Sequence, residues 1–195
     1  QKAKKHYWPP ILLKNIPLIC GNHSTDNYLK NSFSSKQLKV FPDTFLEKHY
    51  DYVVWFDDKY NSKKHQNIDI NNTIKHILLI HQQPSPPAIL MHKHPFLYNI
   101  NQEYECAIHY QPRYLKEQKQ YQAYINRQLA NGLSSNQGIH YQTGFIIYNF
   151  THKKTKEIQS TWMQHIKDCG IQCQISFNFV HQLYPKCISA VPFRV

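Results

Sequence analysis

A chain of 195 residues, 41% of them hydrophobic, is long enough to bury a sizeable core and fits one globular domain. Its formal charge of +11 and pI near 9.4 favour anionic partners: nucleic acid, acidic polysaccharide, a membrane surface or a diphosphate ligand. No run of about 18 or more apolar residues is present, so no segment is expected to span a bilayer.

The cysteines and glycines argue against several common kinds of site. The five cysteines include no Cys-x-x-Cys pair, which makes a structural zinc site unlikely on spacing and leaves disulfides open. The five glycines form no phosphate-binding or dinucleotide-binding loop, and no Gly-x-Ser-x-Gly motif is present. The start at Gln1, without Met, indicates a processed or excised piece. The expected location is the cytoplasm, or the secretory lumen if a targeting segment was removed.

The N-terminal part of the chain has short apolar runs between polar stretches. We expect strands over residues 16–20, 38–41 and 52–56. Residues 22–37 are rich in Ser and Asn and predict a loop or a short helix. A turn of helix is expected at 43–46, where Asp43 or Thr44 can act as the cap.

The middle of the chain alternates between the two kinds of element. A regular element is expected over 73–81, then a Pro-rich loop over 82–87 and a strand over 88–91. Helices are predicted over 101–107 and 115–130, separated by Pro112 and ended at Gly132.

The C-terminal part continues the pattern. Residues 141–150 predict a strand, and a helix starting at Thr151 or Thr155 is expected to stop at Gly170. Residues 172–180 alternate polar and apolar side chains, as on a half-buried strand or a helix edge. The alternation of strands and helices, with no repeat or linker, indicates a single α/β domain over residues 1–195.

The apolar run Tyr52–Phe56 ends in two adjacent carboxylates, Asp57 and Asp58. An unalternating run of this kind suits a parallel strand covered on both faces, and ligands of open α/β sheets bind beyond the carboxyl ends of the strands. Two acids there could hold a hard divalent cation. The alternative is an ordinary strand followed by a polar turn.

Two further strand ends carry polar side chains. His92 and His94 stand at i and i+2, which predicts that both rings share one face of a strand, where they could contact phosphate or a sugar hydroxyl. Thr143 and Gly144 open another strand, where Gly144 permits close approach of backbone or ligand. The alternatives are a solvated basic strand end and an ordinary core strand.

Several short motifs together resemble the TOD/mucilage-related glycosyltransferase-like family, once catalogued as a domain of unknown function. The resemblance spans about residues 36–181 and depends on the order of the motifs. They are Phe41-Pro42-Asp43, Tyr50 to Asp57, His92-x-His94-Pro95, Glu103-x-Glu105-Cys106, Gln120 to Tyr124, Gly132-Leu133, Trp162 and Gln174-Ile175-Ser176-Phe177.

This chain also departs from that family. The family has Arg after His-Pro, where this chain has Phe96-Leu97-Tyr98, and it has Arg-Asp-Gln where this chain has Gln172-Cys173-Gln174. We also expect the first strand of the family's fold to lie before the start of this chain. The departures imply altered donor binding or loss of catalysis.

The resemblance implies a GT-A-like fold, with a mostly parallel central sheet flanked by helices. It implies a hexosyl- or pentosyltransferase that moves sugar from a nucleotide-sugar donor to a glycan or glycoprotein acceptor. Mn²⁺ or Mg²⁺ would bridge the donor diphosphate and offset its developing charge. On that reading Asp57 holds the metal, with His181 as a further ligand.

The remaining expected roles concern donor, substrate and catalysis. Glu103 or Glu105 is the candidate acid/base group. The expected donor- and substrate-binding residues are Asp58, His92, His94, Thr143, Gly144 and Gln174.

Two other functions remain open. One is a catalytically degenerate glycosyltransferase-like domain that binds glycans or has a structural part. The other is a basic nucleic-acid-binding module, because the segment Tyr110–Lys116, with Tyr121, Tyr124 and Arg127, interleaves aromatic and cationic residues. Tyr121 and Tyr124 also lie on the apolar face of the predicted helix, which favours core packing.

Overall fold

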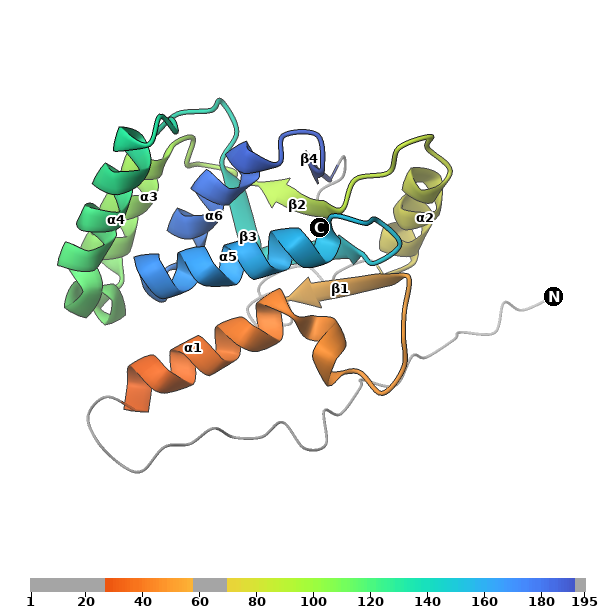
Figure 1. Cartoon of the computed structure of the whole chain (residues 1–195), viewed down its shortest axis with the longest axis horizontal. Helices are drawn as coiled ribbons and strands as arrows, with labels where there is room; N and C mark the ends of the chain where they lie inside the picture. The colour runs from red at the N-terminus through yellow and green to blue at the C-terminus, as the bar shows by residue number, and fades with distance from the viewer. Residues whose placement is uncertain (1–26, 58–69, 192–195) are drawn as a thin grey trace.

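The computed structural model describes residues 27–57 and 70–191, in which helices pack around a single four-stranded sheet (Figure 1). The strands are β1 (Tyr52–Phe56), β2 (Ile89–Lys93), β3 (Tyr141–Asn149) and β4 (Ile188–Ala190). The helices are α1 (Asn27–Val40), α2 (Ile70–His81), α3 (Ile100–Tyr110), α4 (Gln118–Ala130), α5 (Thr155–Cys169) and α6 (Cys173–Leu183), with the short 3-10 helices η1 (Pro42–Phe45) and η3 (Pro112–Glu117). The expected strand at 16–20 and Asp58 lie outside the described residues. None of the described helices combines the length and apolar character needed to cross a bilayer.

The mixed α/β class is confirmed, but the mostly parallel sheet is not. The strand order is β1-β3-β2-β4, and β3 runs antiparallel to both of its neighbours. Within the described strands only β2 and β4 pair in parallel. The cover expected on both faces of the Tyr52–Phe56 run is also not found among the described residues, because β1 is an edge strand whose first four residues are half-buried and whose last, Phe56, is exposed. Because β3 is antiparallel to both β1 and β2, its first residues lie beside the last residues of those two strands.

Alternate residues of the strands face two different clusters of the core. Ile146 and Tyr148 of β3 pack with Trp162 of α5 and Phe177 of α6 on one face of the sheet. Phe145 and Ile147 pack on the other face, in a cluster that includes Ile80 of α2. Figure 1 accordingly shows α5, α6 and α1 on one side of the sheet and α2 apart from them. The period of two along β3 therefore determines which helices cover each face.

A third cluster joins α3, α4 and α6 at one end of the molecule. Its fully buried members include Tyr121 and Tyr124, which are 0% and 1% exposed. The expectation that these two tyrosines belong to the core is confirmed. They are therefore removed from the set of aromatic residues that a nucleic-acid strand could stack on.

Most predicted elements are present, and one is of the wrong type. The strands expected at 52–56, 88–91 and 141–150 and the helices after 101, 115 and 155 all occur, with shifts of a few residues. Residues 38–41, predicted as a strand, largely form the last turn of α1, where Lys39 and Val40 are buried. Residues 172–180, for which a half-buried strand and a helix edge were both open, belong to the helical alternative: Gln172 is the N-cap of helix α6, and most side chains of 173–180 are buried.

The corner between α5 and α6 requires a glycine. Gly170 has φ of 115°, and a Cβ there would lie 2.7 Å from Tyr121 Cε1 and 2.9 Å from Glu117 Oε2. Glu117 is buried and accepts hydrogen bonds from the Tyr121 hydroxyl at 2.5 Å and from the Ile171 backbone N–H at 2.9 Å. This close approach joins η3 to the start of the segment that leads into α6.

We expect Gly170→Ala to lower the free energy of unfolding by about 2 to 5 kcal/mol, since it combines backbone strain with overpacking. Gly132→Ala is the matched control, because Gly132 also has a positive φ of 86° but nothing lies within 4 Å of its added Cβ. That variant should lose only about 1 to 2 kcal/mol. Urea unfolding of both proteins measures the difference. Equal losses would show that the contact with Glu117 and Tyr121 is unimportant.

Candidate functional site

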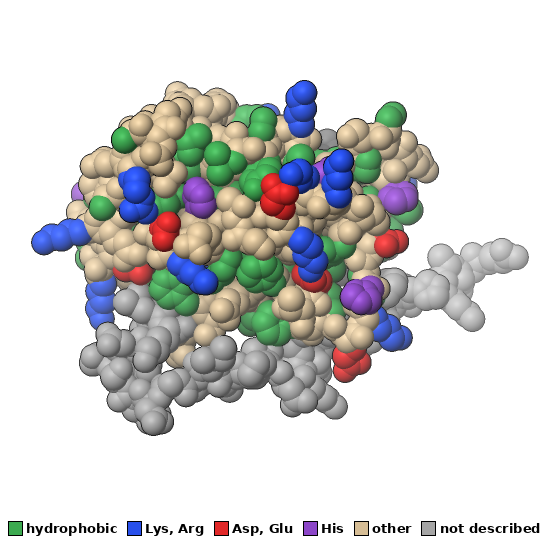
Figure 2. Space-filling view, viewed as in Figure 1, with side chains coloured by type: hydrophobic (Ala, Val, Ile, Leu, Met, Phe, Trp, Pro, Cys, Tyr) green, Lys and Arg blue, Asp and Glu red, His purple; other side chains and the backbone are tan. Residues whose placement is uncertain are grey.

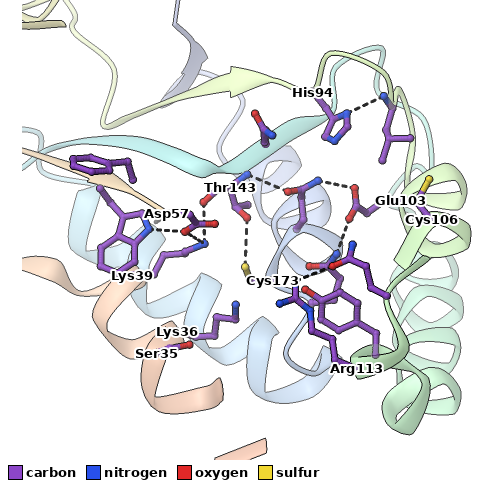
Figure 3. A pocket seen from close by; sticks show the side chains of 18 of the residues that line it. Ser35, Lys36, Lys39, Asp57, His94, Glu103, Cys106, Arg113, Thr143 and Cys173 are labelled. Atoms are coloured by element: carbon purple, nitrogen blue, oxygen red, sulfur yellow. Dashed lines mark hydrogen bonds and ion pairs between the residues drawn. The ribbon is translucent and has the colours of Figure 1, made fainter. Parts of the chain in front are cut away.

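A pocket of about 830 Å³ opens where β1 and β2 end and β3 begins (Figure 3). Residues from separate elements converge on it: Asp57 follows β1, His94 follows β2, Thr143 lies in β3, Glu103 in α3 and Gln174 in α6. All five are residues to which the sequence assigned a site role. The β2–β3 ladder is irregular here, because Met91 lies opposite Ile146 while His92 lies opposite Gln142. Such irregularities often redirect side chains near a site.

The other predicted residues lie differently. Gly144 contributes backbone, since its carbonyl accepts a hydrogen bond from the Asp57 N–H at 2.8 Å. His92 is half-buried, with its ring centroid 4.7 Å from that of Phe145, and does not line the pocket. It does not act with His94 because β2 ends at Lys93, so the i and i+2 rule of a strand no longer applies.

Glu105 and His181 also lie away from the pocket lining. The Glu105 side chain is 61% exposed and pairs with His109 one helical turn later, at 2.8 Å. His181 is on α6, with its ring 5.2 Å from that of Tyr141. Burial lowers the pKa of His181.

Glu103 connects three parts of the pocket wall. Its side chain is 4% exposed and accepts hydrogen bonds from Gln172 Nε2 at 2.7 Å and Gln174 Nε2 at 2.6 Å. His140 Nε2, also buried, lies 3.0 Å from Glu103 Oε2. The oxygen of the Gln174 amide in turn accepts from the Thr143 N–H at 3.3 Å. A single carboxylate thereby fixes α3, α6 and the start of β3 relative to one another.

Asp57, whose side chain is 32% exposed, lies in a second, partly buried network. The Lys39 ammonium is 2.8 Å from Asp57 Oδ1, and the Trp55 indole N–H donates to the same oxygen at 3.0 Å. The Lys39 side chain is only 6% exposed, and its ammonium also donates a hydrogen bond to the Thr143 carbonyl at 3.1 Å. This lysine is on the last turn of α1, so the ion pair ties that helix to the ends of β1 and β3.

Three cations line the described part of the pocket: sequence reasoning assigned no site role to Lys36 and Lys39, and it considered Arg113 only within the nucleic-acid-binding alternative. Lys36 and Lys39 stand one turn apart on α1, which puts them on the same face of the helix. Arg113 lies on η3, where its guanidinium is 4.6 Å from the Tyr114 ring and donates to Gln111 Oε1 at 2.7 Å. The i and i+3 spacing of the lysines was a usable signal, but the predicted strand at 38–41 concealed it.

Cys173 is the first residue of α6 and also lines the pocket. Burial of its thiol opposes ionisation, but the charges of Lys36 and Lys39 and the hydrogen bond with Thr143 outweigh it and lower the Cys173 pKa. The Thr143 Oγ1 and Cys173 Sγ atoms are 3.4 Å apart. The thiol therefore has more thiolate character than a cysteine at this depth normally has.

Exposed rings form part of the pocket rim. Phe56 is 44% exposed and Phe96 is 77% exposed, and both line the pocket. Phe96 is on a turn that His94 organises, because His94 Nδ1 accepts the backbone N–H groups of Phe96 at 3.2 Å and Leu97 at 2.9 Å. Flat apolar faces beside cations suit a ligand that has both a ring and a negative charge.

Of the predicted metal ligands, Asp57 and His181 are not brought together, and Asp58 lies outside the described residues. Asp57 and His181 do not line the same cavity, and an ammonium and an indole N–H already contact Asp57 Oδ1. Across residues 27–57 and 70–191 no group of three His, Cys, Asp or Glu side chains is placed to hold a metal ion.

Lys and Arg side chains are dispersed over the face shown in Figure 2, with acidic side chains among them. They do not form a continuous basic track on that face. This distribution gives no support to the nucleic-acid-binding alternative.

Comparison with known proteins gives no match: no protein-family model fits the chain, and no curated protein or solved structure is significantly similar to it. A function for this chain therefore has to be argued from the pocket.

We expect Glu103→Gln to destabilise the protein by about 1 to 3 kcal/mol, because the new amide N–H₂ group faces donors instead of accepting from them. Glu105→Gln, two residues along the same helix, is the matched control and should change stability by less than about 0.5 kcal/mol. Chemical denaturation of the two variants tests this. Similar stabilities would contradict the role of Glu103 as the centre of the network.

Acid sensitivity should depend in part on His92. Burial lowers its pKa from 6.5 to about 4 in the folded protein, so the unfolded chain binds the proton first as the pH falls. The contribution of neutral His92 to the free energy of unfolding is fully present above about pH 6.5 and is lost as the pH falls toward 4. His92→Gln should therefore lose less stability than the parent over that range. His49→Gln, at an exposed position, should follow the parent. If the free energy of unfolding falls with pH in the same way for His92→Gln and for the parent, this assignment is contradicted.

Proposed function

We propose that the chain binds a nucleotide sugar in this pocket and transfers the sugar to a hydroxyl of a glycan or glycoprotein. In that reaction the bond between the anomeric carbon and the diphosphate oxygen breaks, and its electron pair leaves with the nucleoside diphosphate. The acceptor oxygen bonds to the anomeric carbon, and its proton passes to the leaving diphosphate or to solvent. Positive groups around the diphosphate favour this step because negative charge develops there.

The observation that carries the proposal is the composition of the pocket. Lys36, Lys39 and Arg113 line it together with the exposed rings of Phe56 and Phe96. Its volume of about 830 Å³ falls within the range of small-molecule sites. Its position beyond the ends of β1 and β2 is the usual one for ligands of α/β sheets. The order of motifs that resembles a glycosyltransferase-like family agrees with these features.

A donor-binding protein without turnover is the second candidate. Cys173 stands where the resembling family has Asp, so the pocket lacks one carboxylate of that motif. Such a protein would bind nucleotide sugars and leave them intact. Mass spectrometry of the donor and of a mixture of glycan acceptors after incubation separates the two candidates.

Thermal unfolding with UDP, GDP and their common sugar conjugates, each with Mn²⁺ and with EDTA, tests the proposal. A ligand present at about 100 times its dissociation constant adds about 2.7 kcal/mol, which should raise Tm by about 5 to 10 °C. Inorganic phosphate at the same concentration is the control. Cooperative unfolding with no shift for any nucleotide would contradict nucleotide-sugar binding in this pocket.

Phe96→Ala should weaken binding of the nucleotide about 10-fold if the ring stacks on the ligand. Tyr110→Ala is the matched control, because Tyr110 is 79% exposed but does not line the pocket. Both side chains are largely in water, so neither substitution should change the stability of the free protein appreciably. Equal affinities for the two variants would place the base or sugar elsewhere than on Phe96.

A further inference from the structure

We propose that the side chains of Lys36, Lys39 and Arg113, and not a divalent metal ion, receive the diphosphate of the ligand. This inference depends on the function proposed above and specifies how the site recognises its substrate. It predicts nucleotide binding that persists when divalent ions are removed. It departs from the metal-dependent binding that the sequence led us to expect.

The first argument comes from Asp57. A bridging cation needs oxygen ligands that face the diphosphate, and it keeps several of them at once. The Asp57 Oδ1 atom instead faces the Lys39 ammonium at 2.8 Å, in a site where the lysine is only 6% exposed. The Asp57 side chain is 32% exposed, so the pair is only partly buried, but a metal ion at Oδ1 would still have to displace a charge that already neutralises this carboxylate. The Lys39 ammonium thus supplies the positive charge beside Asp57 that a metal ion would otherwise supply.

The second argument comes from the other carboxylate in the pocket wall. Both oxygens of Glu103 accept hydrogen bonds from amide groups, Gln172 on one and Gln174 on the other. A cation that bound Glu103 would repel those N–H₂ groups and the nearby His140. Glu103 therefore serves the structure of the wall, and the described part of the lining contains no other carboxylate besides Asp57.

The third argument is the balance of charge. Three cations and two carboxylates line the pocket in the described residues, and one cation is already paired with Asp57. No ion pair joins Lys36 or Arg113 to a carboxylate within the described ranges. Lys36 is half-buried beside the thiol of Cys173, while Arg113 is held by stacking and by Gln111. Figure 3 shows these cations beside the same cavity. They leave positive charge available to a bound anion.

The lining also offers donors with the geometry that phosphate groups prefer. The Arg113 guanidinium can present more than one N–H to a phosphate, and it lies 4.6 Å from the centre of the Tyr114 ring. The lysines of α1 act as point charges on the other element. A diphosphate between α1 and η3 would therefore be contacted from two sides.

The experiment is calorimetric titration of the whole protein with UDP and with GDP, in EDTA and in Mn²⁺. We expect the nucleotide that binds to have dissociation constants within about 2-fold of each other in the two buffers. Lys36→Met should weaken binding at least about 10-fold, as expected for loss of a charged hydrogen-bond donor. Lys119→Met, on the exposed part of α4, is the matched control and should bind like the parent. Lys39 is a less suitable position for this test, because its loss removes the ion-pair partner of Asp57 and can prevent folding.

The outcomes separate this inference from the function on which it depends. Binding that requires Mn²⁺ overturns the inference and leaves the nucleotide-sugar site standing. Metal-independent binding that Lys36→Met and Arg113→Met leave unchanged also overturns it, because the diphosphate then lies elsewhere. No binding of either nucleotide in either buffer, by protein that unfolds cooperatively, overturns both the inference and the proposed function.

Discussion

A carboxylate buried away from water must be surrounded by hydrogen-bond donors, and Glu103 shows what that requirement imposes on this fold. Its donors come from Gln172 and Gln174 at the start of α6 and from His140 just before β3. These segments are far apart in the chain and meet only because the corner at Gly170 turns α6 back toward the sheet. Trp162 strengthens the same arrangement, since its indole N–H is 3.2 Å from the Cys173 carbonyl. The wall of the pocket is therefore held from α3, α5 and α6 together.

The Lys39–Asp57 pair makes a similar demand on the opposite wall. Desolvating two charges is favourable only when the remaining donors and acceptors are also satisfied. Here the Thr143 carbonyl accepts a hydrogen bond from Lys39, and the Trp55 indole N–H donates one to Asp57. Both networks include Thr143, through its carbonyl on one side and its N–H on the other. The start of β3 is consequently the point at which the two halves of the pocket are coupled.

The sequence predicted much of the fold but could not distinguish residues that are chemically alike. Glu103 and Glu105 are equivalent as candidates until the helix turns one inward and the other into water. The sequence also could not show the relative direction of the strands, because the apolar residues of β1 and β3 favour strands but do not indicate whether neighbouring strands are parallel or antiparallel. The end of α1 was misread since Leu38 to Phe41 has the composition of a strand, and tertiary contacts of Lys39 and Val40 outweigh that local preference. Because residues 38–41 were predicted as a strand, the helical spacing of Lys36 and Lys39 was not recognised.

The distribution of charge also bears on what kind of anion this basic protein accepts. A net charge of +11 attracts any polyanion to the surface, but it does not select among them. A single-strand binder needs a track of cations with rings on which successive bases can stack, and the rings of Tyr121 and Tyr124 are buried. The pocket instead confines Lys36, Lys39 and Arg113 around a cavity of about 830 Å³, beside a few exposed rings. Confinement of that kind favours a small ligand with one short run of negative charge over a polymer.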